Sequence, residues 1–174
     1  MKRARQYIGI LVAAAVYYLV HEGAHLLYAV LSGTFKHIRF MGIGMQIDVY
    51  AERMTDGQMA LFCIAGATAT LFTGIVLSAL AGRISRQRSK LLRAVMYYIT
   101  IALLLLDPLY LSILCGIFGG GDMNGISLLC PERIARSAFA VLLMINGWIF
   151  WKRVLPVYKE SFLNEPEIRE HKGT

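Results

Sequence analysis

The sequence predicts an all-α membrane protein with about four transmembrane helices and a short β-hairpin between the first and the second. Three observations favour this class. The 174 residues are 57% hydrophobic and 17% charged, whereas about 25% of the residues in a soluble domain are charged. Several apolar runs reach the roughly 20 residues that a membrane-spanning helix needs. Between the first two runs, hydrophobic residues alternate with polar or small ones, which is typical of a strand.

The four predicted transmembrane helices follow these apolar runs. They cover approximately residues 7–31, 58–81, 92–118 and 134–153. The first run is interrupted only by His21, Glu22 and His25, and the third contains a single acidic residue, Asp107. The fourth is shorter and has Arg136 near its start, where a long basic side chain can reach the membrane surface while its stem stays in the apolar layer.

Residues 34–52 differ from the spans on either side. The stretch IGMQIDV, residues 43–49, alternates between hydrophobic and other residues, and the glycines just before it and within it allow a turn. We expect a short β-hairpin at the outer face of the membrane. Its edge could receive an extended substrate by strand addition, which makes Ile43, Met45 and Ile47 candidate substrate-binding residues. The alternative is a hairpin that only plugs the helix bundle.

The net charge of +7 is concentrated at one end of the predicted bundle. Basic clusters precede the first span, join the second span to the third and follow the fourth. With four spans they all fall on one side, and the positive-inside rule then places both termini in the cytoplasm. This pattern indicates contact with the lipid bilayer rather than with nucleic acid. We expect an integral membrane domain over residues 1–155 and a polar cytoplasmic tail over residues 156–174.

The third span carries features that favour an interior site. Pro108 lacks a backbone N–H, so we expect the helix to kink or open just after Asp107. The glycines at positions 119–121 then allow a tight turn before Asp122. Irregular backbone at this depth is tolerated only where protein or a watery cavity covers it.

The first span contains the motif HEGAH, residues 21–25. His21 and His25 share one helix face, so both imidazoles can bind one ion, and Glu22 can contact a water bound to that ion. Zinc suits two imidazoles and a carboxylate with an open fourth position. Ionisable groups inside a membrane are costly unless they are paired or ligated. We therefore expect one Zn²⁺ per chain; the alternative is a polar packing cluster.

The third protein ligand is either Asp107 or Asp122. Asp107 lies about as far along its span as His21 does along the first, which favours it by depth. However, the residue before a proline often serves as a hydrogen-bonding partner, and Asp122 follows a glycine-rich turn that could fold back toward the metal. The residues alone leave both aspartates open. By position, Asn124 is a further candidate, as an oxyanion donor.

An ordered set of motifs resembles the site-2 protease group of intramembrane zinc metalloproteases, the M50 peptidases, and especially its small bacterial members. The set is HEGAH, a hairpin-like segment, AGATATLFTG at residues 65–74, LDPLY and GGGDMNG, and it covers roughly residues 7–130. The resemblance implies a site-2-protease-like core. It also implies that Asp122 is the third metal ligand, with Asp107 as a supporting or substrate-orienting residue. Asp107 and, by its position, Asn124 are also candidate supporting residues or alternative ligands.

The predicted function is hydrolysis of a peptide bond within or next to a transmembrane segment of a membrane-anchored protein or peptide. Glu22 would be the general base that deprotonates a metal-activated water. A catalytically silent metal-binding membrane protein is one alternative, although a purely structural metal site has no use for such a base. A metal transporter is another, although the sequence lacks the spread ionisable ligands and repeats that a transport pathway usually has.

Overall fold

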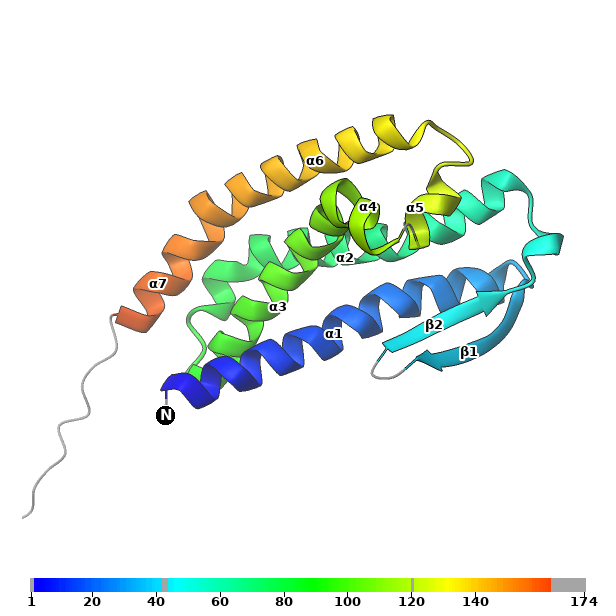
Figure 1. Cartoon of the computed structure of the whole chain (residues 1–174). Helices are drawn as coiled ribbons and strands as arrows, with labels where there is room; N and C mark the ends of the chain where they lie inside the picture. The colour runs from blue at the N-terminus through cyan, green and yellow to red at the C-terminus, as the bar shows by residue number, and fades with distance from the viewer. Residues whose placement is uncertain (1, 42–43, 120, 164–174) are drawn as a thin grey trace, which may run out of the picture.

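The computed structural model describes residues 2–41, 44–119 and 121–163 (Figure 1). Four long helices form a bundle: α1 (Lys2–Leu31), α2 (Asp56–Ile84), α3 (Lys90–Leu109) and α6 (Glu132–Ile149). Strands β1 (Phe35–Met41) and β2 (Gly44–Val49) follow α1, and a 3-10 turn η1 (Ala51–Arg53) leads into α2. Short helices α4 (Cys115–Phe118) and α5 (Gly121–Ile126) connect α3 to α6.

Four helical stretches are long and apolar enough to cross a membrane. They are Arg3–Leu31, Asp56–Ile84, Lys90–Phe118 and Glu132–Leu163. Many large apolar side chains on their outer surfaces are exposed, for example Leu11 at 70%, Phe72 at 68% and Trp148 at 62%. Water would be a poor solvent for such a surface, whereas lipid would not. The sequence-based prediction of four spans is therefore confirmed at the level of helix length and composition.

The N-terminus, the α2–α3 turn and the end of α7 (Leu155–Leu163) lie at one end of the bundle (Figure 1). The turn from β2 through η1 into α2 lies at the other end, and α4 and α5 lie between the two ends. The three basic clusters of the sequence therefore gather at the first end, as expected for helices that alternate in direction. The membrane side on which this end lies stays a prediction of the charge pattern.

The predicted β-hairpin is present as a two-stranded antiparallel sheet. Ile38 pairs with Ile47 and Phe40 with Met45, and the register shifts between Phe35 and His37. Ile47 is buried, with 4% of its surface exposed, because β2 packs against α1. The turn lies outside the described residues, and with it Ile43.

The helix does not break after Asp107, and the irregularity expected at this point takes the form of a change of helix type. Helix α3 continues through Pro108 and is followed by one π-helical turn, η2 (Tyr110–Leu114), before α4. Because Pro108 has no N–H, the carbonyl of Leu104 loses its usual donor in the helix. The side-chain amide of Asn146 on α6 donates to this carbonyl at 2.9 Å instead. A side chain of the neighbouring helix α6 thus supplies the donor that the Leu104 carbonyl lacks within its own helix.

We expect the Asn146→Leu substitution to destabilise the protein by about 1–3 kcal/mol, since it leaves the buried Leu104 carbonyl without a donor. Loss of helical circular dichroism during unfolding in detergent, with increasing SDS, measures the change. Ser137→Leu is the matched control, because Ser137 is exposed on the same helix and its replacement should change stability little. Equal stability of the two variants would contradict this account of the proline.

The helical structure continues past residue 155, the predicted boundary between membrane domain and tail. A π-helical turn, η3 (Phe150–Val154), joins α6 to α7, which ends at Leu163. Tyr158 is only 1% exposed and belongs to a small core with Ala81 and Val154. Because Lys159 and Glu160 flank Tyr158 on its C-terminal side, the sequence does not indicate that Tyr158 is buried. The rest of the predicted tail, residues 164–174, lies outside the described residues.

Candidate metal centre

The two histidines of the HEGAH motif lie on the inner face of α1. His21 is 9% exposed and His25 is 3% exposed. Since they are four residues apart on a helix, they lie one turn apart on the same face. Their Nε2 atoms are 3.1 Å from each other. The motif therefore presents two nitrogen atoms at one point, as the sequence predicts.

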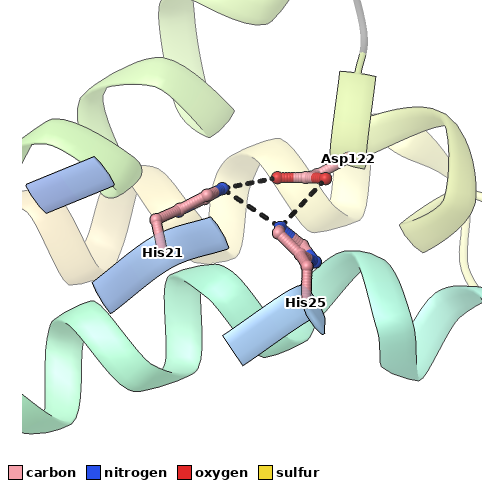
Figure 2. A group of neighbouring side chains, drawn as sticks. All are labelled: His21, His25 and Asp122. Atoms are coloured by element: carbon pink, nitrogen blue, oxygen red, sulfur yellow. Dashed lines mark hydrogen bonds and ion pairs between the residues drawn. The ribbon is translucent and has the colours of Figure 1, made fainter. Parts of the chain in front are cut away.

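Asp122 reaches the same point from α5 (Figure 2). Its Oδ2 atom lies 3.2 Å from Nε2 of His21, and its Oδ1 atom lies 3.6 Å from Nε2 of His25. Two glycines with positive φ, Gly119 at +102° and Gly121 at +25°, turn the chain back toward α1. This backbone conformation is accessible to glycine at little cost.

The spacing of these three side chains fits a metal ion. Nitrogen and oxygen ligands lie about 2.1 Å from a tetrahedral zinc ion, which puts two ligand atoms about 3.4 Å apart. The distances of 3.1, 3.2 and 3.6 Å among His21, His25 and Asp122 lie around that value. All three ligand atoms lie within 4.8 Å of one another. These residues could therefore hold a metal ion, and the geometry leaves room for a fourth ligand.

Asp122 is ionised in this arrangement. It lies between the third and the fourth spanning segments. Burial raises the pKa of its carboxyl, but hydrogen bonds and charge interactions with His21 and His25 outweigh that effect and hold the pKa at about 2. A carboxylate, not a carboxylic acid, thus faces the two imidazoles at neutral pH.

Asp107 lies on the other side of His21. One carboxylate oxygen is 3.1 Å from Nδ1 of His21, and the hydroxyl groups of Tyr17 and Thr70 both donate to this carboxylate. Asp107 therefore meets the nitrogen that points away from the Asp122 side chain. Such a carboxylate fixes the ring orientation of a metal-binding histidine and makes its free nitrogen a better ligand.

His25 is held in a comparable way. Its Nδ1 atom is 2.8 Å from the backbone carbonyl of Phe62 on α2, so the ring N–H donates to that carbonyl and leaves Nε2 free. The backbone of α2 also comes very close at Gly66. A Cβ atom at this position would lie 2.6 Å from Nε2 of His25 and 2.7 Å from Cε1 of His21. Only glycine fits between the two rings and the helix.

A cavity of about 470 Å³ opens over the cluster. Glu22, Tyr110 and Gly121 line it together with the two histidines and Asp122. Glu22 is half-buried, and its carboxylate faces the backbone of Ile47 on β2. The structure thus brings the motif glutamate and the hairpin to the same space as the three candidate ligands.

The structure describes two of the three candidate substrate-binding residues of the hairpin. Met45 and Ile47 line the cavity, whereas Ile43 lies outside the described residues. Asn124 is exposed and does not line the cavity. It follows Asp122 by two positions on α5, and such a step turns a side chain by about 200° around a helix. The structure therefore does not place Asn124 at the cavity, and its role as an oxyanion donor or supporting residue stays a prediction.

Several residues at the site are not found by the motif analysis. The hydroxyl group of Tyr17 donates to Asp107, and the backbone carbonyl of Phe62 accepts a hydrogen bond from His25. Gly66 has no side chain that would clash with the two imidazole rings. Tyr17 lies four residues before His21, so helix periodicity could have indicated that they share a face. Phe62 acts through its backbone, which leaves no signal in the sequence.

The fold and the site are those of a chain with four helices long and apolar enough to cross a membrane and a His-His-Asp cluster in which both histidines are buried. No family model matches the chain, and comparisons with curated proteins and with solved structures give no match either.

Proposed function

We propose that this protein is an intramembrane zinc metalloprotease of the site-2 protease type. The observation that carries the proposal is the common cavity of Glu22 and the His21–His25–Asp122 cluster. A structural zinc site usually closes its fourth position with another protein ligand and has no adjacent base. Here a carboxylate that ligates nothing in the cluster lies next to the ligands, as hydrolysis requires.

The donor set is the one that zinc prefers for catalysis, since two imidazoles and a carboxylate leave a position for water. Bound there, zinc would activate a water molecule and polarise the carbonyl of the substrate. Glu22 would be the residue that takes a proton from the attacking water and gives it to the leaving amine. Asp107 holds His21 in place through Nδ1, and the Phe62 carbonyl does the same for His25.

Strand β2 supports a route for substrate binding. It pairs with β1 along one edge, and among the described residues no further strand pairs with its other edge. The backbone of Ile47 faces Glu22, and Gly44, Met45 and Gln46 line the same cavity. A substrate segment that adds to this edge would be extended, so its peptide bonds would be exposed next to Glu22.

We expect the purified protein to cleave both a fluorescent casein and a single-span reporter reconstituted in the same vesicles. A strong chelator should stop cleavage, because the ligands alone do not activate water, and one equivalent of Zn²⁺ per chain should restore it. Gel analysis of the fragments and zinc content per chain are the two measurements. Stoichiometric zinc without cleavage of either substrate would support the silent metal-binding protein, and zinc flux into sealed vesicles the transporter.

A further inference from the structure

A second cavity, of about 510 Å³, lies at the end of the bundle away from the metal cluster. It is enclosed by the start of α1, the first turns of α3 and the helix α7, which meet at this end (Figure 1). Its volume is within the roughly 300–1,000 Å³ of typical small-molecule sites. The mechanism proposed above uses none of the residues that line it.

The polar part of this cavity is positively charged. Arg5 of α1 and Lys159 of α7 line it, together with the amide of Gln6, and none of its lining residues is acidic. The one acidic residue of α7, Glu160, does not line it. Arg5 is half-buried and Lys159 is exposed, and both line the cavity. An anion placed between them would meet two donors that come from opposite ends of the chain.

The rest of the cavity wall is aromatic and apolar. Tyr97 packs against Tyr98 and Tyr158, with ring centroids 5.4 and 5.2 Å apart. Tyr97, Tyr98, Tyr158 and Phe162 all line the cavity. Leu163, which also lines it, is 70% exposed. The cavity therefore joins a cationic site to an apolar outer surface, which would face lipid if the helices span a membrane.

We propose that this cavity binds the headgroup of an anionic phospholipid, with Arg5 and Lys159 on its phosphate. The phosphate would replace bulk water as the partner of the two cations, and the apolar wall would cover the glycerol and the first part of the acyl chains. The position fits this occupant, because basic pockets between the ends of transmembrane helices bind anionic lipid headgroups. The proposal depends on the helices spanning a membrane and not on proteolysis.

Thermal unfolding of the delipidated protein in detergent tests the proposal. We expect phosphatidylglycerol to raise the Tm of the wild-type protein clearly more than phosphatidylcholine or inorganic phosphate does. The double variant Arg5→Gln/Lys159→Gln should bind phosphatidylglycerol at least about tenfold more weakly, since it lacks both phosphate contacts. The double variant Arg86→Gln/Lys152→Gln is the matched control. It removes two exposed charges from the same end of the bundle, outside the cavity.

Each outcome separates the possibilities. Loss of the phosphatidylglycerol effect in the first variant alone supports a built lipid site. Equal loss in both variants would show general attraction of acidic lipid to a basic surface and would overturn the proposal. An equal effect of inorganic phosphate would show a site for free phosphate rather than for lipid. Both variants should keep the zinc content of the wild type, so a failure of this proposal is distinguishable from a failure of the proposed protease.

Discussion

The Asp122→Ala protein should lose tight zinc binding. Without the carboxylate, the ion keeps only the two imidazoles of His21 and His25, and tight zinc sites in proteins use at least three protein ligands. We expect the dissociation constant, measured by competition with a chromophoric chelator, to rise by at least about 100-fold, more than the 10–100-fold that loss of a supporting contact causes. The helical circular dichroism should stay close to that of the wild type, because Asp122 lies on a short helix of six residues that contributes little to the helical signal.

Asp107→Ala is the comparison that gives this result its meaning. Asp107 touches Nδ1 of His21 and not the point where the Nε2 atoms meet. Its loss frees the ring of His21 to rotate, and we expect about a 10–100-fold rise of the same dissociation constant. Zinc that is lost in Asp107→Ala and retained in Asp122→Ala would exchange the roles of the two aspartates and overturn the ligand set.

The Glu22→Gln protein should bind zinc like the wild type and yet hydrolyse peptide bonds about 10²–10⁴-fold more slowly. Glutamine has nearly the same shape as glutamate, so the packing of α1 and the positions of the histidines should not change. An amide, however, does not accept the proton of the attacking water. The rate of casein cleavage and the zinc content of the same preparation measure the two halves of this expectation.

Glu52→Gln controls for the loss of one negative charge. Glu52 is exposed in η1, between the hairpin and α2, and we expect its replacement to leave the cleavage rate within about twofold of the wild-type rate. Cleavage at the wild-type rate by Glu22→Gln would mean that another group accepts the proton. Loss of zinc in this variant would instead make Glu22 a ligand.

The sequence predicts those parts of the fold that depend on local pattern. Continuous apolar runs mark the four long helices, and alternation marks the hairpin, because each pattern follows from the geometry of one element. The shared face of His21 and His25 follows from helix periodicity in the same way. Features that depend on contacts between two helices or strands are harder to predict from the sequence. Asn146, far along the chain, donates to the carbonyl that Pro108 leaves without a helical donor.

The choice between the two aspartates shows the same limit. Counting along the spans correctly places Asp107 at the level of His21, since the two side chains are 3.1 Å apart. Depth, however, does not tell which ring nitrogen the carboxylate meets, and it meets Nδ1. Asp122 comes next to the histidines because the backbone turns back at Gly119 and Gly121. The resemblance to the site-2 proteases points to Asp122, whereas spacing alone leaves both residues open.

The close contact of α2 with the histidine rings at Gly66 has a consequence for how fast an ion could enter and leave. Each imidazole is fixed by a hydrogen bond at Nδ1, and the backbone at Gly66 closes the space through which the rings would swing. The nitrogen atoms thus converge before any ion arrives, so binding needs little further ordering of the side chains. An ion would enter and leave through the open cavity over the cluster, so its release would be limited by breaking the bonds to the three ligands and not by separation of the helices.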